Sequence, residues 1–463
     1  MKRFKNIGFI WRIALLIGPV CLASTAIGGR KPASYVDFQV DGLLYRGQPV
    51  SGKYEAQIIG TEEGYNETMV VIPETVMNDG VEYQVTSIGE RAFHYTDNPM
   101  KELTIPKTIR TIAYYAFATC EELEKINFNE GLETIGKEAF FYCTSLKELL
   151  FPETLIEIGK QAFWACEDLE SISFPSSLET IGDNAFDDCP KLTSVDLSQT
   201  KVKSLRSTFY ECPNIEEVKL PETLESLKIE FLGDHKTAYM NEKITSLYIP
   251  ASVKEVWGAF PGCPNLKNFI VDPENKYLCS EDGILYSKDK TAIYAYPSLK
   301  GKVRFSEGLK EIGHYAFYGI RTRYSLIFPK SLQKIGSSPF EYSFGVESLT
   351  FLSPNPPESL YGWYDWCWID GSKFDYQIYV PAESLESYKW AEGWEYARDH
   401  LLPIEDVGVE AVADGPEDEY ADIYTLTGVL MQSNVKVSEL NRLLPPGLYI
   451  RVSPSGTSKI LIR

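Results

Sequence analysis

Apolar positions recur along this chain with a fixed step. From Leu132 onward the residues follow the pattern L-x-x-I-G-x-x-A-F-x-x-C-x-x-L-x-x-I-x-F-P, in which Phe and Cys mark the phase. The markers, each 23 positions after the last, are Phe117, Phe140, Phe163, Phe186 and Phe209 together with Cys120, Cys143, Cys166, Cys189 and Cys212. A constant step in this range predicts a solenoid, because one coil cannot bury its apolar side alone and must stack on its neighbours.

Two kinds of local structure are expected within one coil. The segment 123–128, Leu-Glu-Lys-Ile-Asn-Phe, has the apolar spacing of a short strand, and Pro or a polar turn closes the equivalent segments. The apolar and small residues of segment 135–140 lie three to five positions apart, which favours a tight helical turn on the opposite side. The sequence therefore predicts an α/β solenoid whose parallel sheet lies on the concave face of a curved rod.

The repeated I-G-x-x-A-F-x-x-C-x-x-L-x-x-I pattern resembles that of the BspA-type leucine-rich repeat proteins, found on the surfaces of bacteria and some protists. The likeness covers residues 83–352, with further phase markers at Phe93, Phe231, Phe260, Phe317 and Phe340. Longer steps before Phe260 and Phe317 predict insertions near residues 235–243 and 280–289. The resemblance implies a right-handed leucine-rich repeat array that serves in adhesion, to matrix proteins or to other bacteria.

Both flanks of the array carry signals of their own. Residues 1–26 have a basic start, a short apolar run and a small-residue cleavage site, which is typical of a secretory signal peptide. We favour cleavage of this segment over lipid anchoring at Cys21. Residues 27–82 and 353–404 are expected to form β-rich caps that cover the open ends of the solenoid, with an amphipathic helix over 384–400.

The C-terminal part is predicted to be a separate unit. Residues 405–420 are acidic and poor in large aliphatic residues, which indicates a linker. Residues 421–463 carry strand and turn signals and resemble the C-terminal sorting domain read by the type IX secretion system, although this segment is shorter. The resemblance implies export to the cell surface or the medium, and a small stabilising β unit is the alternative.

Composition and charge narrow the choice of partner. The chain has 463 residues, of which 44% are hydrophobic and 24% charged, so it can bury a large core. Its 45 Lys and Arg residues against 65 Asp and Glu residues give a net charge of -20. Nucleic acid and anionic lipid both need a basic surface, so neither is expected as the main partner. The apolar run near the N-terminus is too short to span a bilayer, and no transmembrane segment is expected in the mature chain.

The cysteines admit three interpretations. Five of them repeat at the coil spacing, which stacks them roughly 5 Å apart in an oxidising compartment. We favour a ladder of buried thiols, because each coil needs a compact residue that turns inward and a thiol serves as a small hydrophobe. Alternating disulfides between neighbouring coils and a metal site are the other two possibilities.

Signals for catalysis are weak. The segment Gly131 to Lys137 approaches a phosphate-binding loop, but Glu138 stands where a magnesium-binding hydroxyl is required. The four histidines do not lie in a metal-binding or catalytic spacing. The sequence therefore predicts no enzymatic activity, no metal and no cofactor.

Two sets of residues are candidates for binding. With the Leu, Ile and Phe side chains of each strand inward, ten residues face outward on the concave side: Lys125, Asn127, Glu148, Leu150, Ser171, Ser173, Ser194, Asp196, Glu217 and Lys219. This set is mixed and polar, and a merely solvated sheet is the alternative. The second set is an aromatic cluster of Trp363, Tyr364, Trp366 and Trp368, which could stack on sugars or plug the last coil. We favour the plug.

The function predicted first is that of a secreted or surface-attached protein, expected as a monomer, that binds a host or bacterial surface protein in adhesion. The second prediction is a glycan-binding accessory protein that uses the Trp363 to Trp368 cluster.

Overall fold

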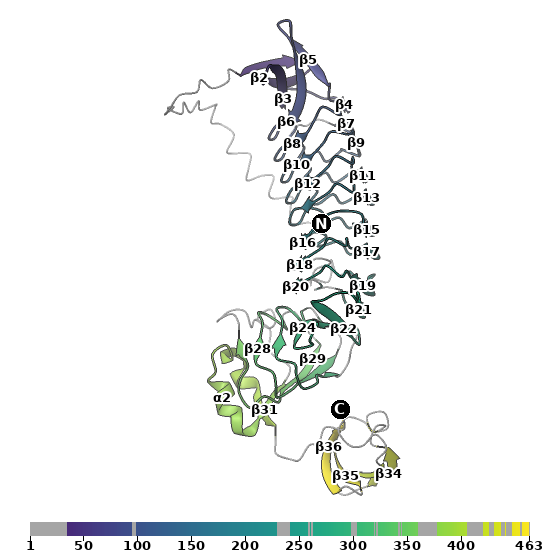
Figure 1. Ribbon diagram of the computed structural model, residues 1–463, viewed down its shortest axis with the longest axis vertical. Helices are drawn as coiled ribbons and strands as arrows, with labels where there is room; N and C mark the ends of the chain where they lie inside the picture. The colour runs from purple at the N-terminus through teal and green to yellow at the C-terminus, as the bar shows by residue number, and fades with distance from the viewer. Residues whose placement is uncertain are drawn as a thin grey trace.

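The computed structural model is a long rod with a smaller sheet near the C-terminus (Figure 1). It describes residues 35–94, 99–228, 241–257, 260, 263–297, 303–318, 320, 323–340, 343, 345–359, 377–404, 420–425, 430–436, 440, 447–453 and 456–462. The signal peptide, the marker Phe231, the aromatic cluster of residues 363–368 and nearly all of the acidic linker lie outside these residues.

One row of strands along the rod confirms the predicted parallel sheet. Its members are β4 (Met69–Val71), β7 (Glu102–Ile105), β9 (Lys125–Phe128), β11 (Glu148–Leu150), β13 (Ser171–Ser173), β15 (Ser194–Asp196), β17 (Glu217–Lys219), β19 (Ser246–Ile249) and β21 (Asn268–Val271). Neighbours pair in parallel at the repeat step, as Leu149 with Ile172 and Val195 with Val218 do. The apolar spacing in each coil therefore located these strands correctly.

A second row of strands lies on the opposite side of the coils (Figure 1). It consists of β6 (Val81–Ile88), β8 (Thr111–Ile112), β10 (Thr134–Ile135), β12 (Glu157–Ile158), β14 (Thr180–Ile181), β16 (Ser204–Arg206), β18 (Ser226–Lys228) and β20 (Glu255–Trp257). These pairs are parallel too, for example Ile135 with Ile158. Each coil thus has two short strands where the sequence predicted one.

The predicted helical turn is wrong. Glu138 and Tyr142 have φ of 56° and 62°, and the equivalent residues of neighbouring coils share this left-handed conformation. The backbone N–H of Phe140 therefore donates to Ala162 of the next coil, at 2.8 Å. Because no helical segment occurs in the described residues of the solenoid, the α/β class is corrected to a solenoid of parallel β-strands.

The core is a stack of phenylalanine rings along the axis of the rod. Phe163 is fully buried, and its ring centroid lies 5.2 Å from that of Phe140 and 5.4 Å from that of Phe186, with nearly parallel planes. Gly182 allows this close stacking, because a Cβ atom there would lie 2.3 Å from the backbone nitrogen of Lys160. The repeat step, the inward Phe and the glycine are thus parts of one packing arrangement.

The N-terminal strands continue the second row of the rod. They are β1 (Val36–Val40), β2 (Leu43–Val50), β3 (Lys53–Thr61) and β5 (Thr75–Asn78), and the sheet order runs β1-β2-β3-β6-β8. Tyr45 and Ile58 from these strands are buried in the same core as the first coils. These strands lie within residues 27–82, for which β-rich structure was expected.

The later coils are interrupted and then resume. An inserted hairpin consists of β22 (Leu278–Glu281) and β23 (Ile284–Ser287), and its turn residues Asp282 and Gly283 both have positive φ, as a two-residue hairpin turn requires. The following strands are β24 (Ala292–Ala295), β25 (Val303–Arg304), β26 (Glu311–Ile312), β27 (Tyr324–Phe328), β28 (Lys334–Ile335), β29 (Val346–Phe351) and β30 (Glu358–Ser359). They enclose a second hydrophobic core that contains Phe317 and Phe340.

The rod is followed by a short helical segment. Strand β31 (Gln377–Pro381) leads into η2 (Ala382–Ser384), α2 (Leu385–Lys389) and η3 (Glu395–His400), and β32 (Leu401–Ile404) pairs with β31. The helix predicted over 384–400 is therefore broken into a short α-helix and 3-10 turns. Trp394 is fully buried, with its ring centroid 5.1 Å from that of Phe351. Strands β33 (Tyr420–Thr425), β34 (Leu430–Lys436), β35 (Gly447–Ser453) and β36 (Gly456–Ile462) form a separate antiparallel sheet.

Candidate functional site

The ten outward residues predicted from the repeat all lie on one row of strands, β9 to β17. We call this set the candidate face. Nine of the ten side chains are exposed and Asn127 is half-buried, while the residues between them, such as Leu149 and Val195, are buried. The alternation follows from strand geometry, since successive side chains point to opposite sides of the sheet.

The candidate face is organised as two columns. The parallel register places Glu148 beside Ser171, and Leu150 beside Ser173. In the next pair of strands, Asp196 lies beside Lys219. Every coil therefore adds one residue to each column, and a backbone ladder joins the strands beneath them in the pairs β11–β13 and β15–β17.

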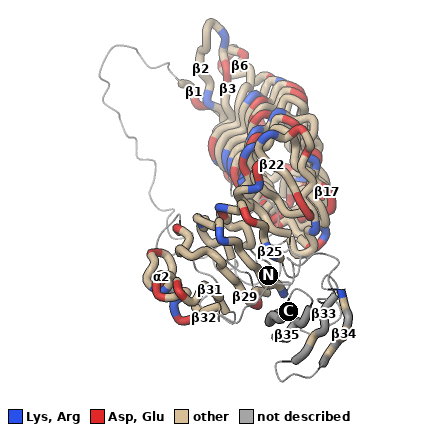
Figure 2. The backbone as a smooth tube through the Cα atoms, turned by 60° about the horizontal axis from the view of Figure 1, so that its bottom comes forward, with Lys and Arg blue, Asp and Glu red and all other residues tan. Residues whose placement is uncertain are grey.

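Charge on the candidate face is mixed and locally compensated. The Lys219 ammonium lies 3.2 Å from Asp196 and 3.6 Å from Glu217. Hydrogen bonds from Ser198 and the nearby Lys219 hold the pKa of Asp196 below its ordinary value. Figure 2 shows Lys and Arg interspersed with Asp and Glu around the coils. The face therefore has no single-sign field that would select a strongly charged ligand.

The same row of strands carries further exposed residues that the sequence analysis did not identify. Tyr248 and Ile270 lie side by side on β19 and β21, with exposed fractions of 42% and 50%. The Tyr248 hydroxyl donates to Asp272, and this bond raises the pKa of the tyrosine to about 12. These residues were missed because the step of the repeat changes at the insertion before Phe260. The apolar alternation in residues 247–249 was the signal that could have found them.

The seven cysteines that the structure describes carry free thiols. Cys166 and Cys189 are fully buried, and each Sγ donates to the backbone carbonyl of a phenylalanine, at 3.7 Å to Phe140 and 3.6 Å to Phe163. Burial holds the pKa of both thiols above its ordinary value. In the described residues, no group of three or more His, Cys, Asp or Glu side chains is placed to hold a metal ion.

Ser343 shows what the cysteine position of each coil requires. It occupies the cysteine position of its own coil, three residues after Phe340, and its hydroxyl donates to the carbonyl of Phe317. The position therefore takes a small side chain whose donor bonds the buried carbonyl of a stacked phenylalanine. The Phe140 carbonyl, for example, accepts from the Cys166 thiol as well as from the backbone N–H of Cys143. The cysteine ladder has a structural role.

Two acidic residues on the turn side of the rod have strongly perturbed titration. Asp187 is 7% exposed, and its Oδ2 accepts from Asn184 at 2.9 Å, whereas its Oδ1 is buried without a hydrogen-bond partner among the described residues. Burial raises the pKa of Asp187 to about 8 and that of Asp188 to about 6, where Glu167 adds to the effect. They lie outside the candidate face, and sequence reasoning did not single them out.

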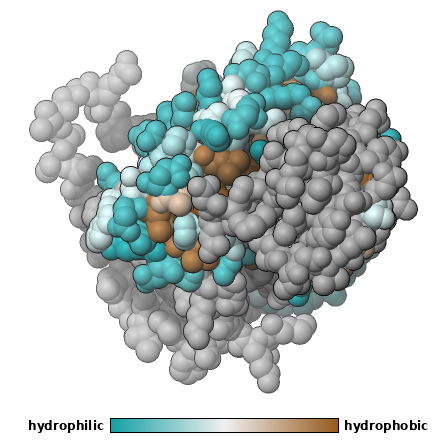
Figure 3. Space-filling view, turned by 90° about the horizontal axis from the view of Figure 1, so that it is seen from below, coloured by the Kyte–Doolittle hydropathy of each residue, from teal (hydrophilic) through white to brown (hydrophobic). Residues whose placement is uncertain are grey.

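The second candidate set, Trp363, Tyr364, Trp366 and Trp368, lies outside the described residues. Figure 3 views the rod from the end nearer the C-terminus, where the described surface is largely hydrophilic with apolar patches between. In the portion of the chain that the structure describes, no helix is long and apolar enough to cross a membrane.

The fold defines a repeat solenoid with an exposed face of parallel strands. The chain matches the family described as the BspA type leucine rich repeat region (6 copies). The matched residues are 80–176, 133–267 and 289–367, which together make up more than half of the chain. The chain therefore belongs to the BspA-type leucine-rich repeat family, as the repeated pattern indicated.

Solved structures from bacteria resemble the rod. A leucine rich cell surface protein from Faecalibacterium prausnitzii A2-165 shares 21% identity over 80% of this chain and 94% of its own, with a TM-score of 0.53, which shows the fold alone. A leucine-rich repeat protein from Bacteroides ovatus shares 24% identity over 80% of this chain and 100% of its own, with a TM-score of 0.46. None of the curated proteins matches the sequence.

Proposed function

We propose that the chain is an exported surface protein that binds a protein partner in adhesion, through the candidate face. The observation that carries the proposal is the pair of exposed columns on five consecutive parallel strands. Because the stacked coils hold the backbone of these strands before any partner arrives, only the side chains lose conformational freedom on binding. A rigid array of this kind favours recognition of another folded surface.

The chemistry of the candidate face fits a protein partner. Leu150 is 58% exposed and lies beside the small Ser173, so a side chain of the partner can reach the leucine from above the sheet. Charged residues such as Asp196 and Lys219 are exposed further along the rod. An apolar contact with polar surroundings is the usual anatomy of a transient protein interface.

The length of the row is sufficient for such an interface. With strands about 4.8 Å apart, the nine strands from β4 to β21 extend roughly 40 Å. A stable interface needs about 800 Å² on each partner, which a strip of this length can supply if the partner also contacts the turns beside it. The proposal includes no enzymatic activity and no cofactor, and takes the chain as a monomer.

Export is the second part of the proposal. Residues 1–26 would direct secretion as a cleaved signal peptide, in preference to a lipid anchor at Cys21, and residues 421–463 would act as a type IX sorting domain. Support comes from the sequence patterns, and the F. prausnitzii neighbour is itself named a cell surface protein. The glycan-binding alternative rests on the Trp363 to Trp368 cluster, and a glycan array tests it directly.

An array of extracellular matrix proteins and glycans, probed with the purified chain lacking residues 1–26, tests the interaction. We expect binding to a matrix protein that the paired variant Leu150→Arg, Ser173→Arg weakens at least about tenfold, or about 1.4 kcal/mol. The matched control is Glu157→Arg with Thr180→Arg, two exposed residues paired in the same way on β12 and β14. Equal loss in both variants would refute the assignment of the face, and binding to glycans alone would favour the alternative.

A further inference from the structure

Strand β4 is the first strand of its row, and one of its edges has no strand beside it in the described sheet. On the β7 side, the Thr68 carbonyl accepts from Glu102 at 3.1 Å and the Ile72 N–H donates to Thr104 at 3.1 Å. In a parallel strand, the backbone N–H and C=O groups of every second residue point to the same neighbouring strand. The backbone groups of residues 68, 70 and 72 therefore face β7. The backbone groups of Met69 and Val71 therefore face away from the sheet.

These outward backbone groups form an open edge. Within the described residues, no backbone hydrogen bond reaches Met69 or Val71 from that side. Their side chains are 63% and 65% exposed. They are the most exposed pair of large apolar residues two positions apart on a strand of the described solenoid. An edge with unpaired N–H and C=O groups is a template for another strand unless charge, proline or a bulge blocks it. Residues 69–71 contain none of these.

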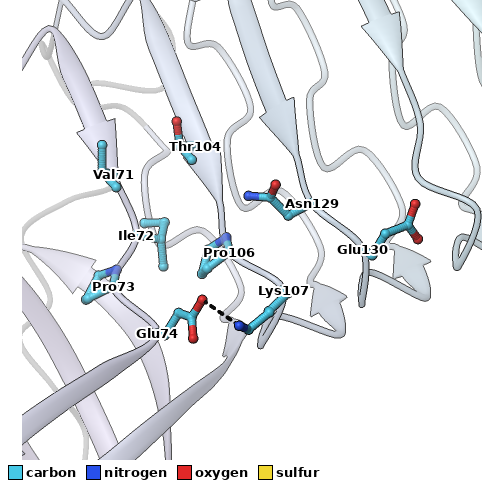
Figure 4. A pocket seen from close by; sticks show the side chains of 9 residues that line it. All are labelled: Val71, Ile72, Pro73, Glu74, Thr104, Pro106, Lys107, Asn129 and Glu130. Atoms are coloured by element: carbon cyan, nitrogen blue, oxygen red, sulfur yellow. Dashed lines mark ion pairs between the residues drawn. The ribbon is translucent and has the colours of Figure 1, made fainter.

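A pocket of about 580 Å³ lies where β4, β7 and β9 end, on the β7 side of β4. Figure 4 shows Val71 and Thr104 on one side of it, and Pro106 and Asn129 where the following strands end. An ion pair between Glu74 and Lys107, 3.4 Å long, crosses its rim. The pocket has both apolar and polar walls, and β4 separates it from a segment added at the open edge.

The segment of chain that leads into β4 is acidic. Glu62, Glu63 and Glu67 precede β4 and are exposed, and no ion pair involving them occurs among the described residues. The nearby bases are already engaged, since Lys107 pairs with Glu74 and Lys101 lies 4.0 Å from Glu124. Charge complementarity therefore selects a basic ligand rather than an acidic one.

We propose that the open edge of β4 binds an extended, basic segment of another polypeptide as an added β-strand. Backbone hydrogen bonds to Met69 and Val71 supply the affinity, as in other strand-addition complexes, and the three glutamates select a basic sequence. This site uses the edge of the sheet, so it does not depend on a partner binding the candidate face.

The probe is a synthetic octapeptide of alternating Val and Lys with blocked ends, titrated calorimetrically into the chain lacking residues 1–26 at low salt. We expect saturable binding that is lost when alternate peptide nitrogens are methylated, and that weakens when Glu replaces Lys. Val71→Pro removes an N–H that faces the open edge, and we expect it to weaken binding about tenfold or more. Val71→Thr keeps the N–H and is expected to bind within about threefold of the parent. Binding that tolerates N-methylation would overturn the proposal, as would the absence of binding.

Hydrogen exchange supplies a second measurement that does not need a variant. The amides of Met69 and Val71 should exchange freely in the unbound chain and become protected with the peptide. Protection in the unbound chain that disappears when residues 27–34 are also removed would mean that the chain fills its own edge, which overturns binding of another polypeptide. The matrix-protein array is read separately, so failure here leaves the candidate face untouched.

Discussion

Truncation of one ring in the phenylalanine stack tests the central packing of the rod. Phe163 is fully buried between two stacked neighbours, and Phe151 contacts it edge-on with centroids 5.6 Å apart. Phe163→Ala removes this burial and leaves a cavity, because the coils on both sides are fixed by their backbone ladders. Such truncations cost about 3 to 5 kcal/mol. We expect a value in this range for Phe163→Ala.

Urea unfolding followed by far-ultraviolet circular dichroism measures this loss, provided that the slope of free energy against urea is unchanged. A changed slope would mean that the rod no longer unfolds as one unit. Phe163→Leu keeps most of the volume and should cost less than about 1.5 kcal/mol. Phe141, half-buried on the turn one coil earlier, supplies the matched control. A loss below about 1 kcal/mol for Phe163→Ala, or a larger loss for Phe141→Ala, would refute the assignment of the stack.

Three further predictions concern a buried thiol, a buried carboxyl group and the C-terminal segment. Cys166→Ser keeps the donor to the Phe140 carbonyl and should be more stable than Cys166→Ala by about 1 kcal/mol in the urea assay; equal stabilities would disprove the donor role. Asp187 has a folded pKa above its unfolded value, so its contribution to stability is full at low pH and is lost as pH rises from about 4 to about 8. Asp187→Asn should therefore be the more stable form at pH 8, on the order of 2 kcal/mol, and a difference that does not shrink towards pH 4 would contradict this. Deletion of residues 421–463 should leave the melting temperature of the rod nearly unchanged, while the protein accumulates in the periplasm. If the shortened protein still reaches the cell surface, residues 421–463 are not a sorting signal.

The repeat could be recognised from the sequence because it depends only on the spacing of residues along the chain. An inward position repeats every 23 residues, so the Phe and Cys phases, the strand row and the outward columns of the candidate face all followed from counting. The strand beginning at Lys125 and the outward direction of Leu150 needed only the two-residue alternation of a strand. Where the step changed, before Phe260, the prediction of the face stopped and Tyr248 was missed.

The turn of each coil was misread for a physical reason. Segment 135–140 has helical apolar spacing, but Glu138 adopts a positive φ that costs a non-glycine residue free energy. The compensation comes from outside the segment, because this backbone conformation lets the N–H of Phe140 reach the carbonyl of Ala162 in the next coil. Local propensity could not show a hydrogen bond to a residue 22 positions away.

The sequence by itself determined the step of the repeat, the residues that turn inward and the family, because stacked coils must place the same side chain in the same environment every turn. Only the tertiary structure decided how each coil closes, that Ser343 replaces a cysteine as a donor, that Asp187 is buried, and that β4 ends its row with an open edge. These features depend on which backbone groups of neighbouring coils meet, and that information exists only once the coils are stacked.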